Sequence, residues 1–254
     1  MVDEFLPEEL TEDGFLNGRL KFLQPRDGYR ASMDPVLLAA AVDARPGENV
    51  LELGCGAGVA SLCLASRVLG VRVSGVELQP GYAALARQNA ARNGLAFDVH
   101  TGDVSLPPAG VRAMQFDHVI ANPPYLAGGT GTAAGDAGRE FSQREGTPLA
   151  DWIATGLRRL RPGGWLTMIQ AADRLPELLK GLAQGVGNIC ILPISPRLGR
   201  PAGRVIVRAR KDGKAPFALA APLVLHDGPR HIHDGDDLSV LARAILRDGA
   251  AITF

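Results

Sequence analysis

Four consecutive residues, Asn122-Pro123-Pro124-Tyr125, offer the most specific chemistry in the sequence. They follow an apolar run over 116–121, which predicts a buried strand of a parallel sheet. Proline cannot extend a hydrogen-bonded ladder, so the strand is expected to end there, at the edge where open α/β sheets bind ligands. We expect the Asn122 side-chain carbonyl and the Pro123 backbone carbonyl to point outward, free of nearby donors, and to accept both N–H bonds of a planar NH₂ group. Tyr125 would lie against that group's face. A strand-ending turn with a surface tyrosine is the alternative.

A second motif is Gly54-x-Gly56-x-Gly58, between an expected strand over 49–53 and a helix that begins near residue 60. Glycines are needed where a backbone turns sharply and approaches a ligand without a Cβ atom in the way. Dinucleotide-binding folds hold a pyrophosphate in a similar loop, and Glu52 would repel that group. The carboxylate instead favours a ligand that carries positive charge and no phosphate.

Together the two motifs resemble those of S-adenosylmethionine-dependent methyltransferases that modify an exocyclic or amide nitrogen. S-adenosylmethionine bears an ammonium and a sulfonium and has no phosphate, which suits Glu52. Glu77, followed by Leu78, ends the next expected strand 23 residues after the first glycine, close to the distance at which a carboxylate binds ribose hydroxyls. Asp103, followed by Val104, is expected to accept a hydrogen bond from the cofactor's adenine amino group. A plain turn residue is the alternative for Asp103.

A polar loop and a short helix precede these strands. Asp34-Pro35 has the pattern of an N-cap and a first helical residue, with the helix expected over 36–43. The resemblance implies that Tyr29, Arg30 and Asp34 belong to a lid that closes over the methionine end of the cofactor. For Asp34, an ordinary helix cap is the alternative.

The order of elements predicts an α/β fold of Rossmann-like class I type, with a seven-stranded mostly parallel sheet, an antiparallel edge strand at 204–210 and helices on both faces. Residues 1–46 are expected to form an N-terminal arm and lid, with a mobile acidic arm over 1–18 and a hairpin near 13–23. Residues 47–254 are expected to form the methyltransferase domain. The remaining expected strands are 72–78, 97–100, 116–121, 165–169, 188–193 and 223–226, and the remaining expected helices are 81–93, 151–160, 173–184 and 236–247.

Composition excludes several classes of protein. The chain has 254 residues with no net charge, which argues against a protein that coats nucleic acid. Six acids and no Lys or Arg lie in residues 1–18, so the remainder holds 27 basic against 27 − 6 = 21 acidic residues and can present a basic face. No apolar run is long enough for a membrane span, and the acidic start lacks the basic region of a signal peptide. Three cysteines without metal-like spacing fit the cytoplasm, where we expect the protein. No metal is expected, because His231 and His233 lack a third ligand.

Two arginine-bearing segments are candidates for binding RNA. Residues 127–148 start directly after the Asn-Pro-Pro-Tyr turn, and a loop this long is usually functional or disordered. We expect it to order around the substrate, with Arg139 and Arg144 on phosphates and Pro124 against the target. The run 197–214, which includes Arg197 and Arg200, is expected to form a phosphate track beside the site. The alternative for 127–148 is a flexible insertion, and the alternative for 197–214 is a solvated sheet edge.

Over most of residues 14–250 the chain resembles the bacterial tRNA (adenine-N6) methyltransferases, on the segments LELGCGAGVASLCLA, GVELQPGYAALARQNAARNG, FDHVIANPPY and RVIVRARK. That group modifies the adenosine 3′ of the anticodon in a valine tRNA. The resemblance implies methyl transfer to adenine N6 in tRNA or another RNA, with Asn122, Pro123 and Tyr125 holding the base. Glutamine methylation of release factors, methylation of another RNA amino group, and a non-catalytic cofactor-binding fold remain alternatives. The release-factor enzymes usually carry a separate helical domain, for which the segment before the first strand is short.

Overall fold

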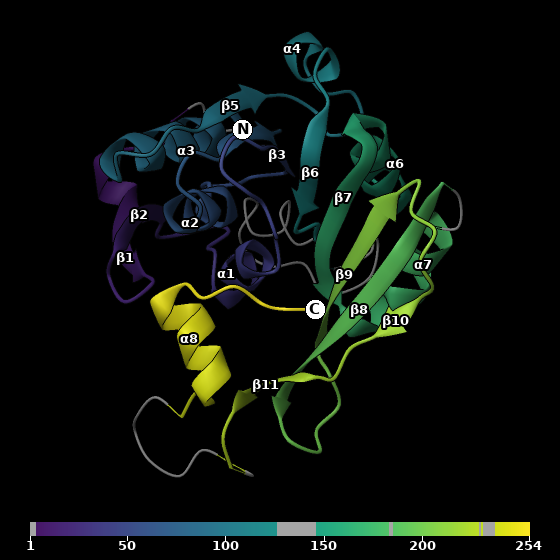
Figure 1. The fold of residues 1–254 in the computed structure, drawn as a ribbon. Helices are drawn as coiled ribbons and strands as arrows, with labels where there is room; N and C mark the ends of the chain where they lie inside the picture. The colour runs from purple at the N-terminus through teal and green to yellow at the C-terminus, as the bar shows by residue number, and fades with distance from the viewer. Residues whose placement is uncertain (1–3, 126–145, 183–184, 229, 231–236) are drawn as a thin grey trace.

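A computed structural model describes residues 4–125, 146–182, 185–228, 230 and 237–254. A nine-stranded sheet forms its centre, in the order β10-β8-β9-β7-β6-β3-β4-β5, with β11 beside β8 (Figure 1). All neighbouring strands are parallel except β9, which is antiparallel to both β7 and β8. The strands are β3 (Asn49–Leu53), β4 (Arg72–Glu77), β5 (Asp98–Thr101), β6 (Phe116–Ala121), β7 (Leu160–Ala171), β8 (Val186–Arg197), β9 (Arg204–Lys211), β10 (Ala218–Leu219) and β11 (Leu223–His226).

The predicted fold class and the antiparallel strand are confirmed, with two corrections. The sheet has nine strands among the described residues instead of seven, and β9 lies between β7 and β8 instead of at the edge. The reason is visible in its sequence. Val205, Ile206 and Val207 are consecutive and all buried, so both faces of β9 are covered, as in an interior strand. The arginines that flank these residues hide this pattern.

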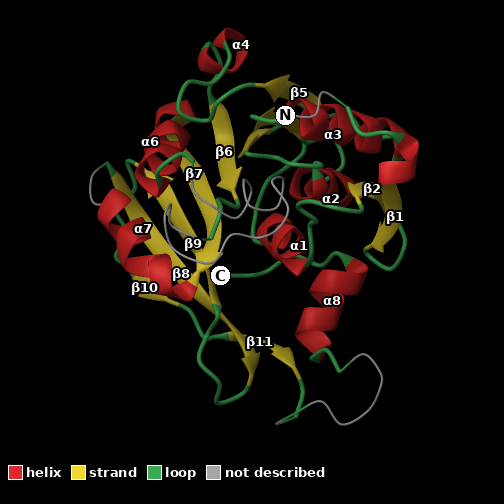
Figure 2. Ribbon diagram, turned by 180° about the vertical axis from the view of Figure 1, so that it is seen from behind, coloured by secondary structure: helices red, strands yellow, loops and turns green. Residues whose placement is uncertain are grey.

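The hydrophobic core forms two layers, one on each face of the sheet. Successive residues of β3 point to opposite faces, so Val50 joins one layer while Leu51 and Leu53 join the other. Helices α1 (Met33–Ala40), α2 (Val59–Arg67) and α8 (Val240–Asp248) pack on the first layer, and α6 (Leu149–Arg159) and α7 (Leu175–Gly181) pack on the second. Helix α3 (Pro80–Arg92) contacts β4 and β5, and α4 (Ala109–Arg112) precedes β6. Figure 2 shows α6 and α7 grouped beside β7 and β8, apart from α1 and α8.

An N-terminal hairpin of β1 (Leu10–Phe15) and β2 (Leu20–Pro25) follows a short 3-10 helix, η1 (Pro7–Glu9). The predicted hairpin is confirmed, but it begins at Leu10, so much of the acidic segment is paired structure instead of an arm. Asn89 of α3 fixes the hairpin: its Oδ1 accepts from Leu23 N at 2.8 Å and its Nδ2 donates to Leu23 O at 3.1 Å. Phe22 lies in the same core layer as the sheet residue Val50.

Two helix predictions change in detail. Helix α1 begins at Met33 after Ser32, so Asp34 is the second helical residue and not the N-cap. Its side chain is therefore not used to cap the helix, and it is buried toward the site. The helix expected over 173–184 is divided into a 3-10 turn, η2 (Ala172–Arg174), and α7, with Pro176 in the first turn of α7. Among the described residues, no helix combines the length and apolarity that crossing a membrane requires.

Candidate active site

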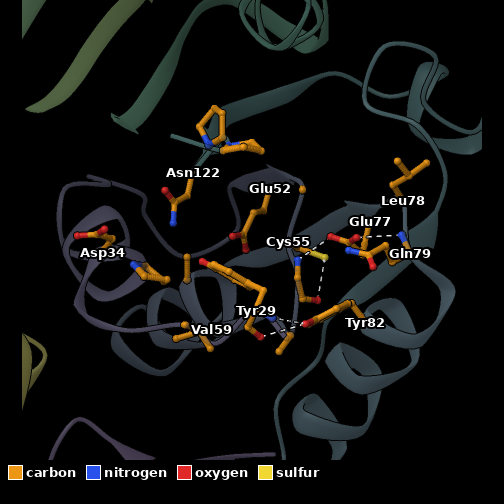
Figure 3. Close-up of a pocket in the computed structure, with 18 of the residues that line it drawn as sticks. Tyr29, Asp34, Glu52, Cys55, Val59, Glu77, Leu78, Gln79, Tyr82 and Asn122 are labelled. Atoms are coloured by element: carbon orange, nitrogen blue, oxygen red, sulfur yellow. Dashed lines mark hydrogen bonds between the residues drawn. The ribbon is translucent and has the colours of Figure 1, made fainter. Parts of the chain in front are cut away.

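A pocket of about 990 Å³ opens at the carboxyl ends of β3, β4 and β6. Parallel strands end at a common edge, which brings together loops that are far apart in the sequence. Figure 3 shows Asn122 on one side of this pocket, Glu77 on the other and Glu52 between them. Most of the predicted site residues line it: Tyr29, Arg30, Asp34, Glu52, Gly54, Gly56, Glu77, Leu78, Asp103, Val104, Asn122, Pro123, Pro124 and Tyr125.

The three glycines after β3 have different tasks, although all have positive φ. A Cβ on Gly54 would lie 2.4 Å from the Trp152 ring, so that position is needed for packing against α6. A Cβ on Gly58 would lie 3.0 Å from the Phe97 ring, and Gly58 is not among the residues that line the pocket. At Gly56 the nearest atom would be Tyr29 Cε1 at 3.8 Å. Gly56 is therefore the glycine that leaves open space for a ligand.

Glu77 ends β4 with its carboxylate held by backbone amides. Gly56 N donates to Oε2 at 2.8 Å and Gln79 N donates to Oε1 at 2.9 Å. Burial raises the pKa of Glu77, and these backbone hydrogen bonds oppose the rise. A carboxylate can accept about four hydrogen bonds, so each oxygen keeps capacity for a ribose hydroxyl. Asp103 is fixed in a similar way, because its Oδ1 accepts from Ser105 N at 2.7 Å and Ser105 Oγ at 2.8 Å.

Glu52 lies beneath the glycine loop and is 3% exposed. Its Oε2 accepts from Ser61 Oγ at 2.6 Å and from Ser61 N at 3.0 Å. Burial raises the pKa of Glu52 to about 8, although both hydrogen bonds from Ser61 oppose the rise. Among the described residues Glu52 pairs with no basic side chain, and such a buried carboxyl suits a ligand that brings its own positive charge.

The segment that was predicted to form a lid, residues 29–34, is held to α3 through Tyr29 and Tyr82. Tyr29 N donates to the Tyr82 hydroxyl at 2.8 Å, and that hydroxyl donates to Tyr29 O at 3.0 Å. Arg30 also lines the pocket, and its guanidinium donates to Thr11 Oγ1 and Pro25 O at 2.7 Å and pairs with Asp13. The Arg30 charge therefore holds the lid to the hairpin.

The Asn-Pro-Pro-Tyr turn leaves β6 as predicted, but its carbonyls are not free of donors. Gln170 Nε2 donates to Pro124 O at 3.2 Å and lies 3.4 Å from Pro123 O, and Arg174 donates to Pro124 O at 3.1 Å. The end of β7 brings these donors, because β6 and β7 pair side by side up to Ala121. The Asn122 Oδ1 atom lies 3.0 Å from the Tyr125 hydroxyl. The expectation of uncontested acceptors was wrong in this respect, although Pro123 O keeps a second lone pair for a ligand.

Most basic side chains of the run 197–214, which was predicted to form a phosphate track, contact other parts of the protein. Arg208 is 8% exposed and lies between the rings of Trp165 and Phe254, 4.7 Å from each centroid. Lys211 donates to the carbonyls of Leu157 and Leu160. Interior strands carry these residues, so their charges are directed to carbonyls and rings within the protein.

Arg197 and Arg200 lie outside the main pocket. Arg197 pairs with Asp237 and donates to the Asp227 carbonyl, whereas Arg200 is exposed. They line a second, smaller hollow together with Pro196, Pro201 and Arg230. Arg139, Arg144, His231 and His233 lie outside the described residues. Within the described part of the chain, no cluster of three or more metal-ligating side chains occurs.

Sequence reasoning missed Arg204, which reaches the site from the start of β9. Its Nε donates to Asp34 Oδ2 at 3.2 Å, and its guanidinium carbon lies 4.3 Å from the Tyr125 ring centroid. A signal was present, because an antiparallel strand begins at the edge where parallel strands end. Trp152 and Gln170 were also missed, and nothing in their local sequence distinguishes them from core residues.

Fold and site together define a class of protein. Counted from one end, β5-β4-β3-β6-β7-β9-β8 forms a parallel sheet with one antiparallel strand. The glycine loop joins β3 to α2, and the Asn-Pro-Pro-Tyr turn follows β6. The open position at Gly56, the oriented Glu77 carboxylate and the buried Glu52 carboxyl fit S-adenosylmethionine. This is a class I methyltransferase that uses S-adenosylmethionine.

Comparison with known proteins shows to which family of methyltransferases the chain belongs. Residues 33–190 match the model of the methyltransferase small domain family. The chain belongs to this family, in the group of bacterial tRNA (adenine-N6) methyltransferases. The recognition made from the sequence is thereby confirmed.

Three relatives illustrate the similarity. A tRNA1(Val) (adenine(37)-N6)-methyltransferase of Yersinia enterocolitica is 29% identical over 213 residues, which cover 82% of this chain and 84% of that protein. A protein of the same name from Porphyromonas gingivalis is 32% identical over 178 residues, which cover 66% of this chain and 69% of that protein. The crystal structure of a predicted O-methyltransferase, protein Atu636 of Agrobacterium tumefaciens, superimposes with a TM-score of 0.70 at 27% identity, over 87% of this chain and 98% of that one.

Proposed function

We propose that this protein transfers a methyl group from S-adenosylmethionine to the exocyclic N6 of an adenine in RNA, in a tRNA beside the anticodon. The observation that carries the proposal is the turn after β6. It sets the Asn122 amide and the Pro123 carbonyl at the pocket edge next to the Tyr125 ring. An aromatic ring with an exocyclic NH₂ group matches this combination, and the named relatives act on tRNA adenine.

The cofactor supplies a methyl group that its sulfonium has already activated. Glu77 would hold the ribose hydroxyls, Asp103 the adenine amino group, and Gly56 and Glu52 the region of the positive charges. Leu78 and Val104 would pack against the cofactor's adenine. With these roles, S-adenosylmethionine would lie between the ends of β3 and β4, on the side of the pocket where Glu77 lies and opposite Asn122 (Figure 3).

The protein's main task is then to orient the acceptor nitrogen. An aromatic amino nitrogen is a poor nucleophile, because its lone pair is delocalised into the ring. Accepting its two N–H bonds at Asn122 Oδ1 and Pro123 O favours a pyramidal nitrogen whose lone pair points at the methyl group, at about 3–3.5 Å. The same oxygens stabilise the positive charge that develops on the nitrogen. No strong general base is required.

Tyr125 would stack on the target base, with a contribution of roughly 1–3 kcal/mol. Arg204 covers one face of the ring, so we assign the base to the opposite face. An adenine in this pocket must leave its own stack, as bases do in other enzymes that modify them. Pro124 would form part of the wall beside it.

Outside the pocket, we assign the RNA backbone to the hollow of Arg197, Arg200 and Arg230. The loop between β8 and β9 carries Arg200 and leads directly into Arg204, so this hollow lies at the same edge of the sheet as the site. Arg139 and Arg144 are proposed to add phosphate contacts. A tRNA substrate implies the cytoplasm as the place of action.

The test is transfer of labelled methyl from S-adenosylmethionine to unmodified total tRNA and, separately, to peptide-chain release factors. Nucleoside mass analysis of labelled tRNA should give N6-methyladenosine. Label in a release factor would move the function to glutamine methylation, and another methylated nucleoside would move it to another RNA amino group. A protein that binds the cofactor and labels neither substrate would contradict the proposal.

Replacing Asn122 by alanine should lower the rate of transfer at least about 100-fold, because one of the two acceptors is lost. Affinity for S-adenosylmethionine, measured by calorimetry, should change little. Asn122→Asp is the matched control, since it keeps an acceptor oxygen in the same place and should retain more activity than the alanine variant. Loss of cofactor binding in Asn122→Ala would show that the residue serves the donor instead.

A further inference from the structure

Side chains from three distant parts of the chain lie around the Tyr125 hydroxyl. The oxygen of this hydroxyl lies 2.6 Å from Asp34 Oδ2 and 3.0 Å from Asn122 Oδ1. Arg204 Nε donates to the same Asp34 oxygen at 3.2 Å. In the pocket, Asp34 and Asn122 lie on the side away from Glu77 (Figure 3). Asp34 comes from α1, Tyr125 from the turn after β6 and Arg204 from β9.

A hydroxyl has one proton, so Tyr125 cannot donate to both acceptors at once. The contact to Asp34 is the shorter one, and its acceptor is a carboxylate, which forms the stronger hydrogen bond. The Tyr125 hydroxyl therefore donates its proton to Asp34 Oδ2 and not to Asn122. Burial, followed by the nearby Asp34 charge, raises the pKa of Tyr125, so the hydroxyl keeps its proton through the neutral range.

The hydroxyl oxygen is then an acceptor on its other side, where it meets the Asn122 amide. With the carbonyl end of the amide toward it, two oxygens face each other without a proton between them. A half-turn about the Cβ–Cγ bond of Asn122 exchanges Oδ1 and Nδ2. After that turn Nδ2 donates to Tyr125, and Oδ1 is directed to the pocket, where a substrate N–H would meet it.

We propose that Asp34 and Arg204 are positioning residues for methyl transfer: by holding the Tyr125 hydroxyl proton, they direct the carbonyl of Asn122 toward the substrate amino group. Arg204 fixes the Asp34 carboxylate and covers one face of the Tyr125 ring. This inference rests on the proposed function, because it concerns the acceptor that Asn122 offers to an NH₂ group. It assigns Asp34 to the substrate side of the pocket instead of the cofactor side.

The test compares Asp34→Asn, Tyr125→Phe and the double variant with the wild type. Asparagine has the shape of aspartate but no charge, and phenylalanine keeps the stacking ring but lacks the hydroxyl. Each single change should lower kcat about tenfold, the effect of one net hydrogen bond. KM for tRNA and the affinity for S-adenosylmethionine should change less than about twofold. Because both changes act through the same hydroxyl, the double variant should be no slower than the slower single variant.

Asp98→Asn is the matched control, since it removes a carboxylate from β5 that is 65% exposed and distant in the sheet. It should leave kcat unchanged. Weakened cofactor binding in Asp34→Asn would overturn the proposal in favour of the lid role. The proposal would also be overturned if the losses in kcat of the two single variants multiplied in the double variant, or if kcat of the single variants were unchanged. A lowered Tm that accounts for all of the lost activity would overturn it too. Failure of the wild type to methylate tRNA would instead count against the proposed function.

Discussion

At the scale of single residues, Glu52 is the least expected occupant of its position. It is a carboxyl with almost no exposure, held by one serine and faced by a second acid, Glu77, which also raises its pKa. Between pH 4.5 and 8 the folded protein keeps a proton on Glu52 that the unfolded chain has lost. The stability of the ligand-free protein therefore falls as the pH rises through this window.

We expect Glu52→Gln to remove this pH dependence. Relative to the wild type, the variant should gain stability on the order of 4 kcal/mol between pH 4.5 and 8, measured by urea unfolding. A positively charged cofactor should release the proton, so calorimetry at pH 7 in buffers of different ionisation enthalpy should detect proton release in the wild type and less in the variant. Glu77 is present in both proteins and acts as an internal control. Equal pH profiles would contradict the prediction.

Thr167, at the centre of β7, is buried with a hydroxyl that finds no hydrogen-bond partner among the described residues. Thr167→Val should raise stability by about 1 kcal/mol, because it removes a buried polar group and keeps the branched shape. Thr155→Val is the matched control. Thr155 is equally buried, but its Oγ1 accepts from Arg158 at 2.7 Å, so that change should destabilise. The midpoint of denaturant unfolding measures the stability of each variant. A lower midpoint for Thr167→Val than for the wild type would contradict the prediction that this change stabilises the protein.

Residues that follow strand ends were predicted from the sequence because their placement is local. Glu77 ends β4, Asn122 directly follows β6 and Asp103 lies two residues after β5, and a parallel sheet brings such positions together. The contacts of Asp34 and Arg204 were not predictable in this way, since 170 residues separate them. The orientation of Arg30 toward the hairpin depends on a tertiary partner, Asp13, that local pattern does not reveal.

At the scale of elements, the loop between β3 and α2 combines packing and binding in neighbouring glycines. Gly54→Ala should destabilise the protein strongly, because its Cβ would lie 2.4 Å from Trp152 and its φ is +64°. Gly56→Ala has only the backbone strain at φ +52°, of order 1 kcal/mol, and its Cβ would occupy the pocket. The two variants are matched controls for each other.

Thermal unfolding and cofactor binding should therefore rank the two variants in opposite orders. Gly54→Ala should show the lower Tm, and Gly56→Ala should show the larger loss of affinity for S-adenosylmethionine relative to its change in Tm. The opposite order would mean that Gly54 is the glycine against which the ligand packs.

The elements themselves were largely predictable, since the strands are short apolar runs bounded by glycine and polar residues. The position of β9 was not, because its arginines suggested an exposed edge. Arg208 in fact lies against Trp165 and Phe254, and long side chains can bury their stems in this way. A pattern of charge alone does not distinguish a solvated strand from one whose charges are used inside the protein.

At the scale of the whole molecule, zero net charge coexists with an exposed basic hollow. Arg200→Gln should weaken tRNA binding several-fold and reduce the slope of log affinity against log salt by about one, because one phosphate contact is lost. Tm should not change, since Arg200 is exposed. Lys180→Gln removes the same charge from the exposed surface of α7 and should leave the slope unchanged. Equal slopes for both variants would exclude the hollow as an RNA contact.

The insertion of β9 between β7 and β8 also has a consequence for synthesis. The residues that we assign to the donor, from Glu52 to Val104, have all been translated by residue 104, whereas Arg204 follows about 100 residues later. At about 5–20 residues per second, the ribosome needs roughly 5–20 s to add this segment. A nascent chain thus contains all of these donor residues while Tyr125 still lacks its partner from β9. The enzyme becomes able to choose and orient a base only near the end of its own production.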